Sequence, residues 1–397
     1  MGNNPEGKKP LVVVAMSGGV DSSLAAFLLH QKGYQVVGMS MKLWDYKEVG
    51  GQLHPDGHCC SLDSLNDARA VSDKIGIPHY VVDLRDDFRK EVISDFVDEY
   101  LKGRTPNPCI ICNMKIKWGS LWKKAQSVGA DSIATGHYAR VEYDRELNRF
   151  LLLKGVDSTR DQSYTLWGLR QDDLRRTFFP LGDLTKKQVR DFARGNGLKV
   201  AAKEESEEIC FVTDNDYPRF IKEWLENKGQ GARGKGQNKI RPGPIFNLKG
   251  EIIGEHPGLQ FYTIGQRKGL KIALGRPLYV VRIDAEKNAI VIGENGDLLK
   301  SSFIVTNPNW IAFEELDKEI DCEIKIRYQH VPQKGRIYPL TGEKVMVRFN
   351  KPERAITPGQ SAVFYQGQVV LGGGVIDVVV DEDLSMDETV SGHTDVV

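Results

Sequence analysis

A strand–loop–helix pattern near the start of the chain constrains the fold most. Leu11–Met16 is a valine-rich apolar run, Ser17–Ser23 reads SGGVDSS, and Leu24–Gln31 has apolar residues at helical spacing. Tyr34–Met41 is a second apolar run, so the segment predicts a β-α-β unit. Strand and helix patterns continue to alternate to about residue 215. This alternation predicts an α/β domain with a parallel, doubly wound sheet.

The elements that follow in this region are also assigned from periodicity and from residues that start or stop helices. We expect strands at His79–Asp83 and Ser132–Thr135. We expect helices at Leu65–Ile75, Phe88–Leu101, Lys117–Ser127 and Leu181–Gly197, the last capped by Asp183.

The second half of the chain changes character after about Phe211. Residues 227–244 are rich in Gly, Lys and Gln and are typical of a loop. Short alternating segments then predict strands at Leu278–Asp284, Ala289–Gly293, Glu323–Tyr328, Lys344–Phe349, Ser361–Tyr365 and Val375–Val380, with a break at Gly372–Gly374. Regular short strands favour small β-domains, the last a β-barrel. We therefore expect domains at 1–215, 216–303 and 304–380, and an acidic tail at 381–397.

Charge is balanced overall but unevenly distributed. The chain has 54 Lys and Arg and 54 Asp and Glu. Residues 222–282 carry 12 Lys and Arg against four Asp and Glu, a net charge of +8, while residues 377–397 hold seven acids and no Lys or Arg. A basic stretch is either a solvated face or a contact surface for phosphates. No run of 18 apolar residues occurs, so we expect no membrane partner and a cytoplasmic protein.

The SGGVDSS segment has the residues of a phosphate-binding loop. Glycines let backbone amides turn toward an anion, serine hydroxyls add donors, and the following helix directs its dipole there. The segment lacks the Gly-Lys-Ser/Thr ending of a Walker loop. Transfer of a γ-phosphoryl group with a P-loop lysine is therefore not indicated.

Three of the six cysteines stand out. Cys109 and Cys112 have C-x-x-C spacing in a loop that Thr105-Pro106 introduces, and Cys210 follows later. C-x-x-C can be half of a zinc site, a redox pair or part of a cluster ligand set. Because Cys59 and Cys60 are adjacent, a four-cysteine zinc site is difficult to assemble. Cysteines can also carry sulfur as a persulfide and release it by forming a disulfide.

The loop resembles the S-G-G-x-D-S fingerprint of the PP-loop ATP pyrophosphatases, and the whole chain resembles the tRNA-specific 2-thiouridylases, the MnmA family. The segments that carry this resemblance are Ala15–Ser22, Thr105–Pro108 with Cys112-Asn113, Thr135–Ala139, Asp161–Tyr164, Ser206–Phe211, Gly258–Gly269, Arg327-Tyr328 and Pro358–Tyr365. They occur in order along nearly the entire sequence.

The resemblance implies ATP-dependent 2-thiolation of the wobble uridine of tRNA Lys, Glu and Gln, with Mg²⁺ near Asp21. It implies an ATP site at Ala15, Met16, Ser17, Gly18, Gly19, Val20, Asp21, Ser22, Met41 and Gly136. It implies Cys112 as nucleophile and Cys210 as the persulfide carrier. It places Asn107, Pro108 and Cys109 at the target base, and His137, Arg160, Asp161, Gln162, Arg327, Tyr328 and Gln360 at the tRNA. Sulfur would arrive from a cysteine desulfurase or relay protein.

Cys109 departs from the commonest family pattern, in which an Asp stands there as a candidate general base. The change leaves the acid–base assignment open and produces a set of three thiolates, Cys109, Cys112 and Cys210. Such a set can hold a 4Fe–4S cluster with one iron open, which is an alternative to the persulfide. A PP-loop synthetase acting on a small substrate and a non-catalytic RNA-binding protein are further alternatives.

Overall fold

The computed structural model describes residues 10–45, 62–203, 209–228, 240–272 and 275–380. The chain forms two compact units. Unit 1 comprises residues 1–94, 108–216 and 368–370, and unit 2 comprises residues 95–107, 217–367 and 371–397. The three domain ranges predicted above stay predictions, and the acidic tail at 381–397 lies outside the described residues.

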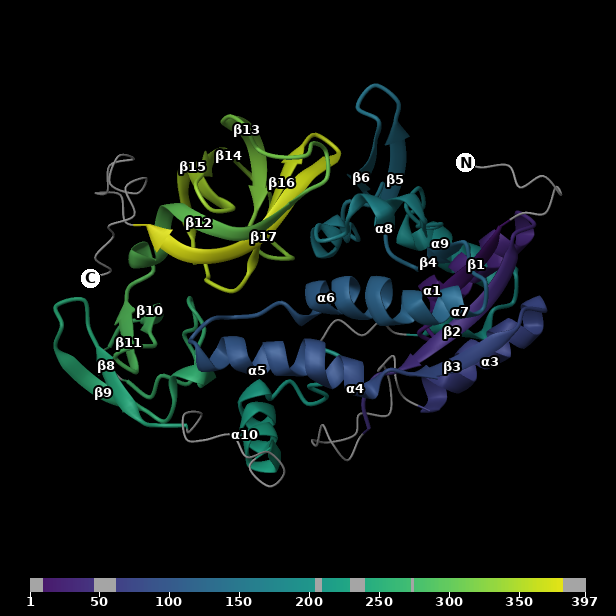
Figure 1. Cartoon of the computed structure of the whole chain (residues 1–397). Coiled ribbons are helices and arrows are strands. Elements are labelled where there is room, and N and C mark those ends of the chain that lie inside the picture. The colour runs from purple at the N-terminus through teal and green to yellow at the C-terminus, as the bar shows by residue number, and fades with distance from the viewer. Residues whose placement is uncertain (1–9, 46–61, 204–208, 229–239, 273–274, 381–397) are drawn as a thin grey trace. The chain divides into compact units, whose positions relative to one another are not determined.

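Unit 1 is built on a five-stranded parallel sheet (Figure 1). Its order is β3 (His79–Asp83), β2 (Gln35–Lys42), β1 (Leu11–Ala15), β4 (Ser132–Ala134) and β7 (Thr177–Phe178), and each neighbouring pair is parallel. Val12, Val13 and Val14 have no exposed surface. Because successive side chains of a strand point to opposite faces, both faces of β1 are covered. This confirms the predicted doubly wound sheet.

Three helices contribute to one hydrophobic core with β1. These are α1 (Val20–Gln31), α3 (Leu62–Ile75) and α9 (Lys186–Gly195). The predicted helix over Leu181–Gly197 starts later than expected, and Asp183 is not its cap. Thr185 caps it: its hydroxyl accepts from the Gln188 N–H, and the Gln188 side chain accepts from the Thr185 N–H. This reciprocal capping box fixes the start of the helix.

The other helices of the α/β region contain π-helical turns. The predicted helix at Phe88–Leu101 is formed by α4 (Arg85–Phe88), a π-helical segment (Arg89–Ile93) and α5 (Ser94–Leu101). The predicted Lys117–Ser127 helix is formed by a π-helical segment (Cys112–Leu121) and α7 (Trp122–Ser127), preceded by α6 (Pro108–Ile111). From Asp95 on, α5 belongs to unit 2. An antiparallel hairpin, β5 (Ala139–Asp144) with β6 (Arg149–Lys154), and the short helix α8 (Gln171–Arg175) complete unit 1.

Unit 2 contains a small four-stranded sheet with its own core. The strand order is β10 (Tyr279–Asp284), β11 (Ala289–Gly293), β8 (Gly243–Phe246) and β9 (Ile252–His256). Ile245, Val280 and Ile290 are fully buried in the core of this sheet. The unit also contains helix α10 (Tyr217–Lys228). The central β-rich region predicted from the short strands is confirmed.

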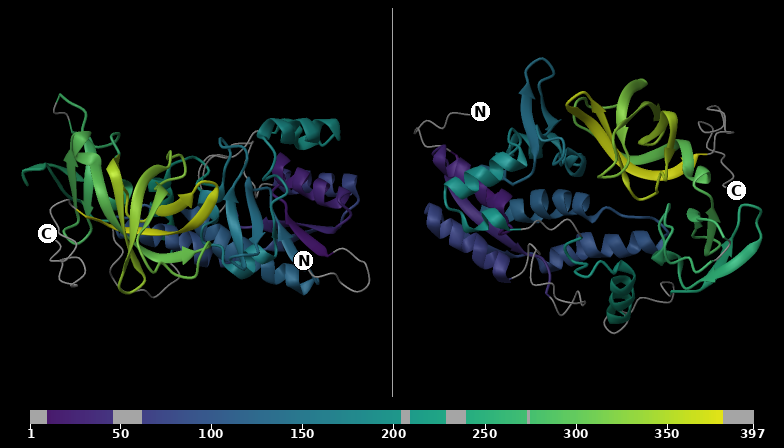
Figure 2. Two further views of the ribbon diagram at one scale, coloured as in Figure 1. Left: turned by 90° about the horizontal axis from the view of Figure 1, so that it is seen from above. Right: turned by 180° about the vertical axis from the view of Figure 1, so that it is seen from behind.

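The C-terminal strands close into a six-stranded barrel, as predicted (Figures 1 and 2). Around the ring the strands are β12 (Leu299–Trp310), β15 (Lys344–Arg354), β14 (Gln333–Leu340), β13 (Ile320–Lys325), β16 (Ser361–Gln366) and β17 (Val369–Val380), and β12 pairs with β17. Apolar side chains fill its interior, among them Phe303, Ile324, Ile337 and Phe364.

The glycine run does not break the last strand, contrary to the prediction. β17 passes through Gly372–Gly374 without interruption. A Cβ on Gly372 would lie 2.5 Å from the Asn309 carbonyl oxygen, and one on Gly374 would lie 2.4 Å from Val305 Cγ1. The glycines therefore permit close approach of β12, which is the role of glycine inside a strand.

Across the described residues, no helix is both long enough and apolar enough to cross a membrane.

Candidate active site

The loop between β1 and α1 lies where the strand order of the sheet reverses. β1 has β2 on one side and β4 on the other, so a crevice is expected at its carboxyl end, where ligands bind in sheets of this type. Gly18 has a φ of +73°, and a Cβ on it would lie 2.0 Å from the Ser64 carbonyl oxygen. Only glycine fits at this position, which explains Gly18 of the motif.

Serine side chains fold the loop around the start of α1. The Ser17 N–H donates to Ser22 Oγ over 3.1 Å, and this hydroxyl donates to the Gly19 carbonyl oxygen over 3.3 Å. α1 begins at Val20, and the amides of a first helical turn have no partner within the helix. Together with the helix dipole, these amides favour a bound anion.

The carboxylate of Asp21 contacts two residues from distant parts of the chain. Lys186 Nζ donates to both carboxylate oxygens over 2.8 Å, and the Tyr138 hydroxyl donates to one of them over 2.8 Å. Lys186 is only 8% exposed. Neither partner was identified from the sequence. The available signal was the Thr185–Gln188 capping box, which sets Lys186 at the first position of a helix.

A second lysine contacts the loop directly. Lys203 Nζ lies 3.4 Å from the Gly18 carbonyl oxygen and donates to Asp67 Oδ2 over 2.7 Å and to Ser64 Oγ over 3.2 Å. The loop sequence itself contains no cationic residue, but the tertiary structure places two lysines beside it, Lys186 and Lys203. Ammonium groups beside an amide-lined loop are suited to a polyphosphate.

β4 ends beside the first turn of α1. A Cβ on Gly136 would lie 2.7 Å from the Ser22 nitrogen and 2.9 Å from Asp21 Cβ, so the close approach requires glycine. Met41 lies near the carboxyl end of β2, at the same edge of the parallel sheet, and is half-buried. The structure therefore brings Gly136 to the Ala15–Ser22 loop and places Met41 at the edge that carries it.

His137, which follows Gly136, is buried among protein partners. Its Nδ1 lies 2.7 Å from Thr135 Oγ1, and its Nε2 accepts a hydrogen bond from Lys117 Nζ over 3.3 Å. Rings of Trp118 and Phe179 pack against it. Burial, and secondly the charge of Lys117, holds the pKa of His137 well below its usual value. The ring is therefore neutral, with its proton on Nδ1.

Cys109 and Cys112 lie on a helix and not in the predicted loop. α6 begins at Pro108 and continues through Cys112 as π-helical turns. Proline is well accommodated at the first helical position, where its missing N–H has no partner to lose. The Asn107-Pro108 pair therefore starts a helix. On this helix Cys109 is exposed and Cys112 is half-buried.

Cys210 is half-buried and belongs to the same unit as these two cysteines. Within the described ranges, no group of three or more His, Cys, Asp or Glu side chains could hold a metal ion. The structure therefore does not assemble Cys109, Cys112 and Cys210 as the metal site considered above. Residues 206–208 of the predicted motif, and Cys59 with Cys60, lie outside the described residues.

Comparisons with known proteins agree along the chain. Residues 10–214 match the family described as tRNA methyl transferase HUP domain, residues 235–294 the tRNA methyl transferase PRC-barrel domain, and residues 300–376 the aminomethyltransferase beta-barrel domain. A tRNA-specific 2-thiouridylase MnmA of Caldanaerobacter subterraneus is 49% identical over 93% of this chain and 98% of its own length. The chain belongs to the tRNA-specific 2-thiouridylase family. A further 2-thiouridylase, from Carboxydothermus hydrogenoformans, is 49% identical over 92% of this chain and 97% of its own.

Membership of the 2-thiouridylase family confirms the resemblance predicted from the motifs and places the chain among the sulfurtransferases. Among solved structures, a 4-thiouridine synthetase–RNA complex with bound ATP is similar over 55% of this chain and 52% of that one. Its identity of 13% and TM-score of 0.32 are too low to support an argument.

The tRNA-contacting residues predicted in unit 1 form an ordered turn. Asp161 accepts from the Ser163 N–H over 3.1 Å and from its hydroxyl over 2.9 Å. Gln162 Oε1 accepts from the Tyr138 N–H over 3.1 Å. Arg160 is half-buried next to them. Asp161 and Gln162 therefore hold the turn that carries Arg160 and tie it to the residue after His137.

Gln360, predicted to contact tRNA, holds another part of unit 2. Its side-chain amide donates to the carbonyl oxygens of Thr105 and Pro106 over 3.0 and 3.1 Å. A Cβ on Gly359 would lie 2.8 Å from the Thr105 nitrogen, and the Gly359 φ is +91°. This turn therefore fixes the backbone that leads directly to Asn107.

Arg327 and Tyr328 form a second predicted tRNA contact in unit 2. The Arg327 guanidinium donates to the Arg354 carbonyl oxygen over 3.1 Å. Tyr328 is 41% exposed, and Lys325 Nζ lies 5.5 Å from the centroid of its ring. The turn therefore presents an aromatic ring with cations beside it, the combination that suits an RNA strand.

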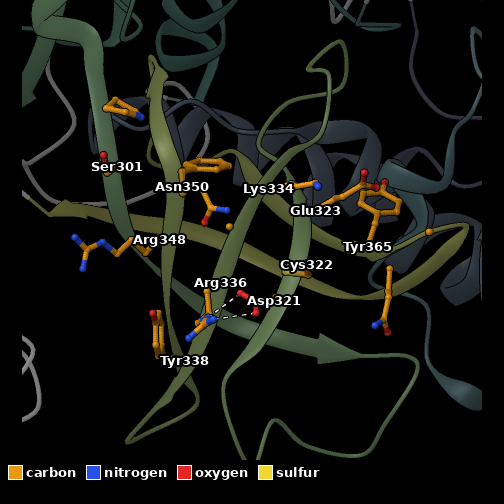
Figure 3. A pocket seen from close by; sticks show the side chains of 15 residues that line it. Ser301, Asp321, Cys322, Glu323, Lys334, Arg336, Tyr338, Arg348, Asn350 and Tyr365 are labelled. Carbon is orange, nitrogen blue, oxygen red and sulfur yellow. Dashed lines mark hydrogen bonds and ion pairs between the residues drawn. The ribbon is translucent and has the colours of Figure 1, made fainter.

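The barrel also has an open cavity of about 1000 Å³, lined mainly by β13, β14 and β15 (Figure 3). On its wall the Arg336 guanidinium donates to both Asp321 carboxylate oxygens, over 2.7 and 2.9 Å. None of the site residues predicted from the sequence lines this cavity.

Proposed function

We propose that this chain uses ATP to activate a uridine of tRNA and replaces the 2-oxygen of that uridine with sulfur. The observation that carries the proposal is the phosphate-type loop at the sheet reversal, with Asp21, Lys186 and Lys203 around it, in a member of the 2-thiouridylase family. At the finer level we propose the wobble uridine of tRNA Lys, Glu and Gln as substrate, and the cytoplasm as location.

In this proposal the nucleotide binds at the loop and the neighbouring strand ends. The residues assigned to it are Ala15, Met16, Ser17, Gly18, Gly19, Val20, Asp21, Ser22, Met41 and Gly136. Lys186 and Lys203 join them because they contact Asp21 and Gly18 of the loop. Loop amides and the two ammonium groups hold the pyrophosphate portion, and Asp21 is the carboxylate available to Mg²⁺. When bound, Mg²⁺ supplies positive charge to the phosphate oxygens.

Activation is needed because a uracil carbonyl oxygen is a poor leaving group. The uracil O2 attacks the α-phosphorus of ATP, and pyrophosphate departs with the electron pair of the broken P–O bond. Donors placed around the phosphates stabilise the charge that develops there. The base must leave its stack to reach the site, which costs least in a single-stranded loop such as an anticodon.

Sulfur transfer then uses two cysteines. The terminal sulfur of a Cys210 persulfide attacks C2 of the base, and AMP leaves. The Cys112 thiolate next attacks Cys210 Sγ, which breaks the S–S bond, leaves sulfur on C2 and joins Cys112 to Cys210 as a disulfide. A thiol reductant then reduces the disulfide to two free thiols and is itself oxidised, and a cysteine desulfurase or relay protein reloads Cys210 with sulfane sulfur.

The remaining predicted residues are assigned to RNA. Asn107, Pro108 and Cys109 line the site of the target base. His137, Arg160, Asp161, Gln162, Arg327, Tyr328 and Gln360 lie at or support the tRNA-contacting surfaces.

The persulfide route is preferred to a 4Fe–4S cluster for a structural reason. Three cluster ligands must lie around one small cubane. Cys109, Cys112 and Cys210 are not gathered in this way in the described structure. No step of the proposal therefore uses a cluster.

The decisive experiment supplies purified protein with ATP, Mg²⁺, a sulfur donor and unmodified tRNA. We expect 2-thiouridine, detected by mass spectrometry of the nucleosides, and AMP formation that requires tRNA. AMP formation on a small substrate without tRNA would contradict the proposal in favour of a synthetase.

The basic segment gives a separate prediction for RNA affinity. Arg267 and Lys268 are exposed in unit 2. Replacing both with methionine should reduce the slope of log K against log salt by about 1–2, because each phosphate contact contributes roughly 0.7–0.9. The measurement is tRNA binding over a range of salt concentrations. The matched control replaces Lys123 and Lys124, an exposed adjacent pair in unit 1, and should leave the slope unchanged. An equal slope in both double variants would place the RNA surface elsewhere.

A further inference from the structure

Lys117 occupies an unusual electrostatic position in unit 1. Its side chain is half-buried, and its ammonium donates to the neutral ring of His137 over 3.3 Å. Among the residues that the structure describes, no carboxylate forms an ion pair with it. A partly desolvated cation without a counter-ion is unfavourable unless an anion arrives to pair with it.

The contact with His137 fixes where this ammonium lies. His137 follows Gly136, whose backbone touches the first turn of α1 at Asp21 and Ser22. The opposite ring nitrogen of His137 is held by Thr135, at the end of β4. The ring can accept a hydrogen bond from Lys117 because burial keeps it neutral. His137 therefore holds the ammonium beside the residue that follows Gly136, the glycine packed against the first turn of α1.

The other end of Lys117 belongs to the cysteine helix. Lys117 follows Cys112 by five residues within the π-helical segment. Five residues is the span of the π-helical hydrogen bond, so Cys112 and Lys117 lie about one turn apart along this helix. Lys117 thus connects the wall of the nucleotide loop to the helix that carries the proposed nucleophile.

We propose that Lys117 is a catalytic residue of the adenylation step, whose ammonium contacts the α-phosphate of ATP. This inference rests on the proposed function. The loop takes the pyrophosphate portion, so the α-phosphate lies beyond it, toward the uridine and the cysteine helix. There the uracil O2 bonds to the α-phosphorus, the bond to the bridging oxygen breaks, and its electrons leave with pyrophosphate. The N3 proton of the base passes to water.

The test measures single-turnover pyrophosphate release with saturating tRNA and ATP. Lys117→Met should slow this step by about 10²–10³-fold, the usual effect of removing one donor to developing charge. The affinity for tRNA and the melting temperature should stay near those of the wild type. Lys115→Met is the matched control, because Lys115 is exposed on the same helix and should have no effect. His137→Gln should slow the step less than Lys117→Met.

A stereochemical measurement separates contact with the phosphate from a structural role. The two diastereomers of ATPαS carry sulfur at one or the other non-bridging oxygen of the α-phosphate. The wild type should prefer one diastereomer, and Lys117→Met should shift that preference toward unity. If Lys117→Met does not fold, Lys117→Arg serves instead, since a guanidinium would contact the oxygens in a different geometry and change the ratio.

An unchanged diastereomer ratio in the variant, or a rate within threefold of the wild type, would overturn the inference. A wild-type protein that releases no pyrophosphate with tRNA would instead refute the proposed function.

Discussion

Replacing Cys210 with serine is expected to abolish 2-thiouridine formation while tRNA-dependent release of pyrophosphate continues. Serine carries no sulfane sulfur, so the activated base forms but receives none. Loss of product by about 10³-fold or more is expected, because removal of a nucleophile typically has an effect of that order. The measurement combines nucleoside mass spectrometry with a pyrophosphate assay on the same sample. Loss of both activities together would contradict the assignment of Cys210 to the second step.

Cys112→Ser should stop the reaction at the next step, after the persulfide sulfur has bonded to C2 of the base. Sulfur reaches C2, but no thiolate resolves the Cys210–S–S–C2 linkage, so a protein–tRNA adduct should accumulate. A reductant should cleave this adduct, which is visible on a denaturing gel.

Cys109→Ser should retain much of the thiolation activity, since Cys109 only lines the base site. If Cys109→Ser lost iron and activity together, the cluster route would replace the persulfide route.

The control for these variants is Cys322→Ser. Cys322 is buried in the barrel core, and burial raises the pKa of its thiol to about 12. The thiol therefore stays protonated near neutral pH and is a poor nucleophile. This substitution should leave both thiolation and pyrophosphate release unchanged.

The second large effect is expected at the ion pair beside the loop. Asp21→Asn and Lys186→Met should each reduce tRNA-dependent pyrophosphate release by about 10²-fold or more. Lys186→Met removes a cation assigned to the pyrophosphate oxygens, and Asp21→Asn removes the carboxylate assigned to Mg²⁺. Each should also lower the free energy of unfolding by on the order of 2–3 kcal/mol, less than for a fully buried pair, because the Asp21 side chain keeps 28% of its exposure.

The double variant separates the two effects. Asp21→Asn with Lys186→Met leaves no unpaired charge, so it should regain much of the lost stability without regaining activity. Lys187→Met is the matched control, since Lys187 is the exposed neighbour of Lys186 on α9. Denaturant unfolding and the pyrophosphate assay measure the two quantities. Additive stability losses in the double variant would mean that the two side chains do not act as a pair.

The local sequence pattern was sufficient to predict those structural elements that depend only on residues close together in the sequence. The β1–loop–α1 unit follows from an apolar run, glycines and helical spacing, and the structure has these elements where the pattern put them. The short strands of unit 2 are likewise set by alternation and turns. The cysteine helix differs from the predicted loop although its signal is local: Pro108 is compatible with a loop, but proline also starts helices.

Only the tertiary structure decided which distant residues complete the candidate site. Lys186 reaches Asp21 across 165 residues of sequence, and Lys203 reaches Gly18 across 185. Neither lysine belongs to a motif, because its partner is chosen by strand order and helix packing and not by spacing along the chain. The same holds for Gly372–Gly374, which look like a break in the sequence and become a strand only when β12 packs against them. Sequence by itself determined the type of loop and the family, and it predicted the roles of the cysteines; the fold determined the cations that surround the loop, because they come from distant parts of the chain.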